Sequence, residues 1–164
     1  MLHADAPLSL PDIARAANVT YAVAKSAIRT LEKRGLVVRQ IRAGRDEFMP
    51  NKESNYYPMA YGTALVDLPL DTAIKGQNVH AVYAYGSMAL PGGGTSRSDI
   101  DVLIVGDVKD PEKLTFALAD AGERFGRQID PLILTPEQFD EGRARSESHL
   151  MSALAGVRIR GSLA

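Results

Sequence analysis

The chain has 164 residues, enough for one ordinary domain or two small ones, and its 45% apolar and 24% charged residues can bury a core. It contains no cysteine, which excludes disulfides, thiolate metal sites and a cysteine nucleophile. No apolar run reaches the roughly 18–20 residues of a membrane span, and the N-terminus lacks a signal-peptide core, so we expect a cytoplasmic protein.

The net charge of -1 conceals an uneven distribution along the chain. Residues 1–50 carry eight Lys and Arg against five Asp and Glu, whereas residues 51–164 carry eleven against fifteen. The first part is therefore mildly basic and the rest mildly acidic.

Two helices and a hairpin are predicted within residues 1–50. Ser9 can cap a first helix that runs through Ala17, with Pro11 in its first turn and Asp12 completing a capping box. Thr20 can cap a second helix, which ends at Gly35 and has apolar residues at helical spacing: Ala24, Ile28 and Leu31. Residues 36–41 and 45–49, joined by a turn at Ala43-Gly44, are typical of a β-hairpin.

This order of elements predicts a winged helix-turn-helix domain over residues 1–50, with the hairpin as its wing. Its first helix is short or missing, because only Met1 to Leu8 precede the capped helix. A core left open on one side favours association with a partner chain, so we expect a homo-oligomer.

The polar face of the second helix indicates DNA binding. Tyr21, Lys25 and Arg29 recur every four residues opposite the apolar stripe, as in a recognition helix. Arg39, Arg42 and Arg45 lie on the hairpin, where they can meet phosphates. The alternative is an ordinary solvated helix face.

Residues 51–78 are interpreted as a helical connector, with helical stretches at Tyr61 to Val66 and Leu70 to Ile74. Residues 79–164 then alternate strands and helices, which predicts an α/β or α+β domain with a small mixed sheet flanked by helices. Strands are expected at 81–85, 100–105, 128–134 and 157–159. One helix opens at Asp110-Pro111 and carries Leu114, Leu118 and Phe125 inward, and a second opens at a capping box, Thr135-Pro136-Glu137-Gln138.

Two carboxylates at the start of the second of these strands indicate a metal site. Asp99 and Asp101 are two residues apart and would project from one face of a strand, whereas Ile100 would face the other way. Mg²⁺ prefers oxygen ligands, and two ions about 3.5–4 Å apart can orient an attacking hydroxyl and neutralise a leaving pyrophosphate. Asp130, in the next strand, is the candidate third ligand if the two strands are neighbours.

A turn rich in small residues precedes these carboxylates. Gly86-Ser87 directly follows a strand, where glycine lets the backbone approach a phosphate and the serine can donate hydrogen bonds to it. Residues 92–94 are all glycine and can bend the loop back toward Asp99, while Arg97 and Ser98 are further candidate contacts for nucleotide phosphates.

The segment AYGSMALPGGGTSRSDIDVLIVGD resembles the signature of polymerase-beta-type nucleotidyltransferases, especially the minimal nucleotidyltransferase domains of prokaryotes. This resemblance implies that Gly86 and Ser87 hold nucleotide phosphates, that Asp99 and Asp101 bind metal, and that Asp130 helps to activate the acceptor hydroxyl. The whole chain is similar to prokaryotic proteins that join a winged helix to such a domain. The likeness is incomplete, because Ala89-Leu90-Pro91 stands where many minimal domains have Ala-Arg-Gly.

The resemblance implies a magnesium-dependent transfer of a nucleotidyl group from a nucleoside triphosphate to a hydroxyl acceptor. Antitoxins of this superfamily modify a partner toxin, which makes a protein hydroxyl one candidate acceptor. Two alternatives stay open: a transcription regulator whose second domain only binds nucleotide or mediates dimerisation, and an antitoxin that acts mainly through a protein partner. Leu90-Pro91 favours the alternatives, and Asp130 favours catalysis.

Overall fold

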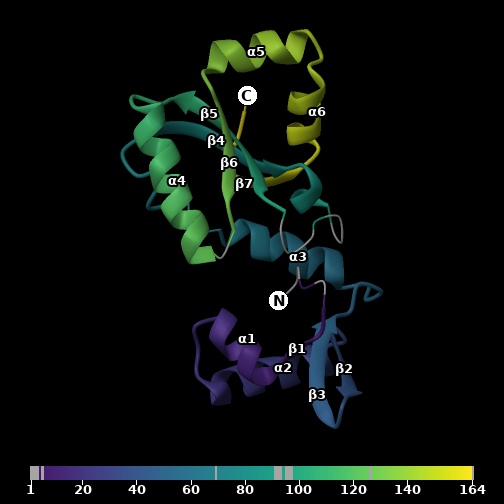
Figure 1. Cartoon of the computed structure of the whole chain (residues 1–164). Coiled ribbons are helices and arrows are strands. Elements are labelled where there is room, and N and C mark those ends of the chain that lie inside the picture. Colours follow the sequence, from purple (N-terminus) through teal and green to yellow (C-terminus); the bar gives the residue numbers. More distant parts are fainter. Residues whose placement is uncertain are drawn as a thin grey trace. The chain divides into compact units, whose positions relative to one another are not determined.

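The computed structural model describes residue 4 and residues 6–68, 70–90, 94, 98–125 and 127–163, without the side chains of residues 124 and 125. The chain forms two compact units, Met1–Tyr61 and Gly62–Ala164, and the division falls inside helix α3 (Tyr57–Val66). Each unit has its own sheet and its own hydrophobic core, and Figure 1 shows their elements. Among the described residues, no helix has the length and apolar character that crossing a bilayer requires.

The first unit contains β1 (Leu8–Ser9), α1 (Leu10–Ala16), α2 (Tyr21–Lys33), β2 (Val37–Arg42) and β3 (Arg45–Pro50). The strands form an antiparallel sheet in the order β1-β3-β2. The hairpin turns at Ala43 and Gly44, which both have positive φ, as a two-residue turn between right-twisted strands requires. The sequence did not predict β1, because a two-residue strand has no alternation to detect.

The caps of both helices in this unit are formed as predicted. The Thr20 side chain accepts a hydrogen bond from the Val23 N–H, and the Ser9 side chain accepts one from the Asp12 N–H. The predicted capping box at Asp12 is formed in part. The Asp12 carboxylate accepts a hydrogen bond from the Ser9 hydroxyl at 2.5 Å, and the hydrogen bonds from Ser9, including one from its backbone N–H, lower the pKa of Asp12. Below the caps, α1 and α2 pack on the sheet around Ile13, Ala14, Ala24, Ile28, Val37 and Phe48.

Between the helix α3 and the second sheet the chain runs through turns. The predicted stretch Tyr61 to Val66 lies within α3, but the predicted helix at Leu70 to Ile74 is wrong. Residues 71–73 form turns, and a single hydrogen bond joins the Ile74 N–H to the Leu70 carbonyl at 2.9 Å. A stretch of this length forms too few hydrogen bonds to offset the free energy of helix nucleation. Its apolar residues Leu70 and Ile74 are instead buried in the core.

The second unit is a four-stranded mixed sheet in the order β6-β5-β4-β7. Strand β4 (Asn78–Tyr85) pairs antiparallel with both β5 (Ile100–Asp107) and β7 (Val157–Gly161), whereas β6 (Ile129–Leu134) pairs parallel with β5. The predicted edge strand near residue 157 is confirmed as β7. Parallel pairing needs a crossover, and α4 (Pro111–Phe125) provides it between β5 and β6.

Helices cover both faces of this sheet (Figure 1). Helix α4 lies against β6 on one face, where Gly122 closely approaches the backbone at Arg127 and Ile129. Leu114 and Leu118 of α4 are fully buried as predicted, whereas the Phe125 side chain lies outside the described residues. On the opposite face lie α5 (Pro136–Ala144) and α6 (Ser148–Leu154), and the predicted capping box of Thr135 and Gln138 at the start of α5 is confirmed.

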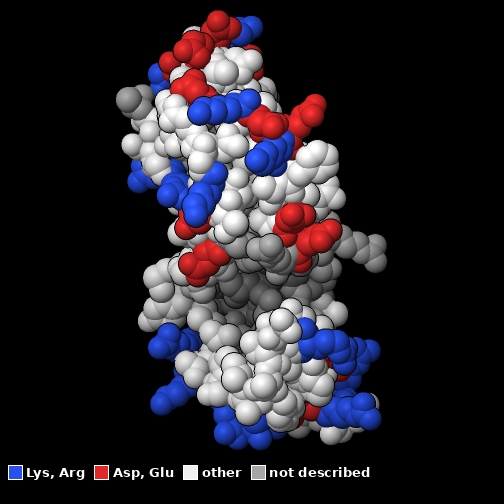
Figure 2. Space-filling model, turned by 90° about the vertical axis from the view of Figure 1, so that its left-hand side faces the viewer, with Lys and Arg blue, Asp and Glu red and all other residues white. Residues whose placement is uncertain are grey.

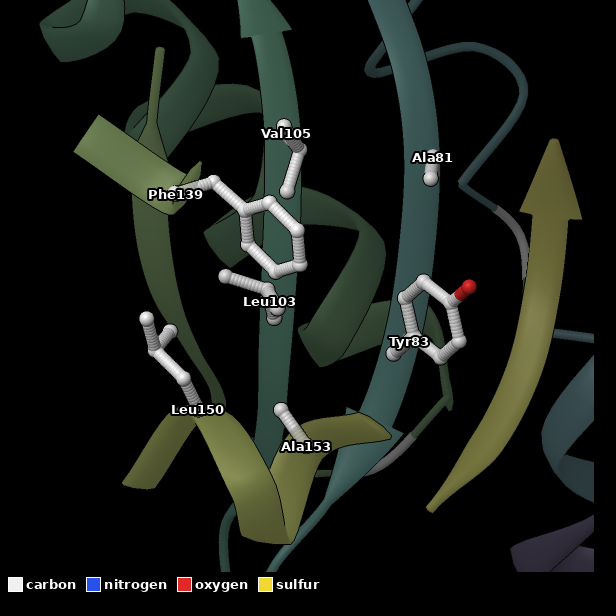
Figure 3. Close-up of a cluster of buried hydrophobic side chains, with 7 residues drawn as sticks. All are labelled: Ala81, Tyr83, Leu103, Val105, Phe139, Leu150 and Ala153. Carbon is white, nitrogen blue, oxygen red and sulfur yellow. The ribbon is translucent and has the colours of Figure 1, made fainter. Parts of the chain in front are cut away.

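The apolar cluster under α5 and α6 joins these helices to the two central strands (Figure 3). Phe139 of α5 and Leu150 of α6 point toward Leu103 and Val105 of β5, while Tyr83 extends the cluster along β4. Leu103 is fully buried at its centre. The alternate residues of each strand that face α5 and α6 are thus apolar over most of their length.

Leu103→Ala should lower the free energy of unfolding of the second unit by about 2–5 kcal/mol, because it leaves a cavity under Phe139 and Leu150. Phe116→Ala is the matched control, since Phe116 on α4 is 74% exposed, and it should change stability by no more than about 0.5 kcal/mol. Urea denaturation followed by circular dichroism measures both. Equal stability of the two variants would contradict this account of the core.

Candidate functional site

A row of polar residues lies at one end of the face that α5 and α6 cover. Asp101 of β5 pairs in register with Tyr85 of β4 on one side and with Asp130 of β6 on the other. Residues opposite each other in a sheet project from the same face, so all three side chains share it. The next row on that face is Tyr83, Leu103 and Leu132, which belongs to the apolar cluster. The row of Tyr85, Asp101 and Asp130 is where this apolar surface gives way to polar groups.

Asp99, the first carboxylate of the predicted pair, lies outside the strand. Strand β5 begins at Ile100, as predicted, so Asp99 is the exposed residue just before it. Ile100 is fully buried on the other face, as predicted. Among the described residues no group of three His, Cys, Asp or Glu side chains is arranged to hold a metal ion.

The electrostatics of the row follow from burial and like charge. Burial raises the pKa of Asp101, and the nearby charges of Asp130 and Asp99 raise it further. Burial also raises the pKa of the Tyr85 phenol, and the charges of Asp101 and Asp130 add to this effect. Within the described part of the chain, no Lys, Arg or His forms an ion pair with any of these carboxylates. As far as the described residues go, the row is therefore a cluster of negative charge without a cationic partner.

The turn after β4 places backbone directly against this cluster. Gly86 has a φ of 69°, and a Cβ at this position would overlap the Asp101 carboxylate oxygen Oδ2. Only glycine allows both the positive φ and the close approach. Ser87 is exposed and begins the short helix η1 (Ser87–Ala89), which no side chain caps.

The loop between η1 and β5 is held at both ends. Gly94 is buried against Met88, and a Cβ there would overlap the Met88 sulfur. At the other end the Arg127 guanidinium donates a hydrogen bond to the Ser98 carbonyl at 3.3 Å. The predicted phosphate contact Arg97 lies outside the described residues, as does Pro91, while Leu90 is 62% exposed.

The sequence did not single out Tyr85 or Arg127. The sequence pattern predicts Tyr85 only as the last apolar residue of a strand. Its position beside Asp101 depends on the pairing of β4 with β5. Arg127 lies in the connection to β6 and reaches a residue 29 positions earlier in the chain. The only local signal was that Tyr85 directly precedes Gly86-Ser87.

The residues predicted to bind DNA form an exposed surface on the first unit. Tyr21, Lys25 and Arg29 lie on the exposed side of α2, opposite the buried Ala24 and Ile28. A surface groove along this side is lined by Ala22, Lys25, Ser26, Arg29, Thr30, Lys33 and Arg34, without a single acidic residue. On the face shown in Figure 2, Lys and Arg predominate over Asp and Glu on the first unit, whereas the second unit carries charges of both signs.

The three arginines of the hairpin are not equivalent. Arg42 and Arg45 face each other in the β2–β3 register at the exposed turn. Arg39 is exposed too, but its guanidinium is 2.7 Å from the Asp46 carboxylate. Arg39 is therefore already partnered within the hairpin, whereas Arg42 and Arg45 place two like charges side by side.

Comparison with known proteins gives little beyond the chain's own geometry. No family model and no curated protein matches the chain. One solved structure, described as a "putative nucleotidyltransferase from Sulfolobus solfataricus", matches with 22% identity and a TM-score of 0.32, over 57% of this chain and 84% of that one. At that TM-score the likeness assigns neither fold nor activity, and the site is interpreted from its own residues.

Asp101→Asn should raise the unfolding temperature at pH 7. The raised pKa means that the folded protein binds a proton at Asp101 more tightly than the unfolded chain does, so stability falls as pH rises through the unfolded value of 3.8 toward the folded value. Asparagine carries no charge and removes this cost, and the difference from wild type should vanish at a pH well below 3.8.

Asp120→Asn, on the exposed side of α4, is the control and should leave the unfolding temperature unchanged at both pH values. Calorimetry measures all three proteins. A lower unfolding temperature for Asp101→Asn at pH 7 would mean that Asp101 has a compensating partner and that the charge cluster is not strained.

Proposed function

We propose that the chain is a nucleotidyltransferase whose site is the polar row at the ends of β4, β5 and β6. The observation that carries this proposal is the register that sets Asp101 beside Asp130, with the Gly86 backbone against Asp101. A turn suited to phosphate binding and a carboxylate pair thus lie together at one end of adjacent strands. This combination suits phosphoryl transfer, which depends on positioning and on neutralising phosphate charge.

Magnesium fits the chemistry of these residues. Carboxylate oxygens are the ligands that Mg²⁺ prefers, and Asp101 stands beside another carboxylate without a cationic partner among the described residues. Asp101 and Asp130, with Asp99 just before β5, would hold the metal, and their carboxylates would have to close around it, because the three are not gathered as a metal site in the structure. When bound, magnesium ions would neutralise the triphosphate and lower the pKa of the attacking hydroxyl.

Different residues of the site would bind the nucleotide and accept the proton. Gly86 and Ser87 would bind the nucleotide phosphates through backbone N–H groups and the serine hydroxyl. Asp130, on the edge strand beside Asp101, would accept the proton of the acceptor hydroxyl. The acceptor oxygen then bonds to the α-phosphorus, and the bond to pyrophosphate breaks. A protein hydroxyl is the acceptor that we propose first.

The proposal is tested by incubating the protein with α-labelled ATP or GTP, Mg²⁺ and cell extract. The wild type should transfer label, and EDTA or the double change Asp99→Ala/Asp101→Ala should abolish transfer. Asp130→Asn should slow it by about 10²–10⁴-fold, the usual contribution of a general base. Asp120→Ala is the control. Transfer by the double variant at the wild-type rate would refute the assignment.

We propose in addition that the first unit is a winged helix that binds DNA, in keeping with its helix-turn-helix and hairpin. The specific observation in favour is the cationic groove along α2, which faces away from the core of its unit and lacks acidic residues. Its cations would contact phosphates, and Arg42 and Arg45 would extend this contact at the hairpin. Their paired like charges would be relieved by an anion.

Lys25→Ala/Arg29→Ala should weaken binding to a mixed-sequence DNA duplex and lower the slope of log K against log salt by roughly 2, one for each phosphate that the variant no longer neutralises. Arg15→Ala is the matched control, because Arg15 is an exposed cation of α1 that pairs with Asp12. Fluorescence anisotropy at several salt concentrations measures the slope. An unchanged slope in the double variant would show that α2 does not meet the DNA backbone.

A further inference from the structure

Tyr85 occupies a place in the candidate site that the proposed function leaves without a role. It is the last residue of β4, directly before the phosphate-binding turn at Gly86, and it pairs in register with Asp101. On its own strand it shares a face with Tyr83, and across the sheet it shares that face with Asp101 and Asp130. It therefore adjoins both the turn and the row of carboxylates.

One side of the Tyr85 ring is held by packing against apolar residues. It is half-buried and packs against the apolar cluster that α5 and α6 form with the sheet. An aromatic side chain has only two torsions, so a ring held on one side has few positions left. The side chain is therefore held near the row that it forms with Asp101 and Asp130.

A phenol is protonated at neutral pH, so the Tyr85 hydroxyl can donate a hydrogen bond. Within the described part of the chain no group forms a hydrogen bond with it. A protonated donor without a partner beside a phosphate-binding turn suits a ligand whose oxygens only accept hydrogen bonds, and phosphate oxygens do so.

We propose that Tyr85 is a nucleotide-binding residue whose hydroxyl donates a hydrogen bond to a phosphate oxygen of the triphosphate held at Gly86 and Ser87. This inference rests on the proposed function, because it assumes that a nucleoside triphosphate binds there. It assigns the nucleotide to the β4 side of Asp101 and leaves the β6 side, with Asp130, for the acceptor. In this proposal, the apolar cluster under α5 and α6 holds the side chain that contacts the nucleotide.

The test compares Tyr85→Phe with Tyr83→Phe. Both remove one hydroxyl from the same face of β4, but Tyr83 is 8% exposed within the apolar cluster. Binding of ATP and GTP analogues that resist cleavage between the α- and β-phosphates is measured by calorimetry in Mg²⁺. Tyr85→Phe should bind roughly ten- to a hundredfold more weakly, as the loss of a hydrogen bond to a charged group predicts, and Tyr83→Phe should bind as wild type does.

A second measurement separates a ligand contact from a structural role. Binding of Mn²⁺ alone should be the same in Tyr85→Phe and wild type, because the carboxylates are intact. Equal nucleotide affinity of Tyr85→Phe and wild type would overturn the inference while leaving the proposed function standing. Parallel loss of Mn²⁺ and nucleotide binding would overturn it too, by showing that Tyr85 shapes the carboxylates. If the wild type binds neither analogue, the proposed function fails and the inference with it.

Discussion

The site depends on the pairing of β5 with its two neighbours. Asp101 meets Tyr85 across an antiparallel pair and Asp130 across a parallel pair, and both partners come from segments distant in the chain. The parallel pair exists because α4 crosses one face of the sheet and returns the chain beside β5. A slip of one residue in either pairing would turn a partner to the other face and disperse the row.

Gathering carboxylates at a half-buried sheet edge has a cost, which the raised pKa of Asp101 expresses. The same strands offset it by burying Leu103 and Val105 under α5 and α6, one row away from the charges. Clusters of like charge that lower stability are common at functional sites, where a bound ligand of opposite charge neutralises them. Gly86 adds a geometric requirement, because any larger residue would displace the Asp101 carboxylate.

The two units present surfaces of opposite charge. The first presents cations on α2 and at its hairpin turn, and the second gathers anions beside a backbone turn. Leu90 is exposed and uncharged, so it would offer no positive charge to a triphosphate bound as we propose, which favours the nucleotide-sensing alternative. The registered pair of Asp101 and Asp130 favours chemistry, since sensing a nucleotide does not require a base on the acceptor side.

The sequence by itself determined what depends on neighbours along the chain. Caps at Thr20 and Thr135, the turn at Ala43-Gly44, the exposed face of α2 and the small-residue turn at Gly86 all follow from local backbone chemistry and periodicity. The tertiary structure alone decided that Asp130 shares a face with Asp101, that Tyr85 joins them and that Arg127 holds the loop at Ser98. Strand register and long-range hydrogen bonds arise from the packing of distant segments, which leaves no periodic pattern in the residues that they bring together.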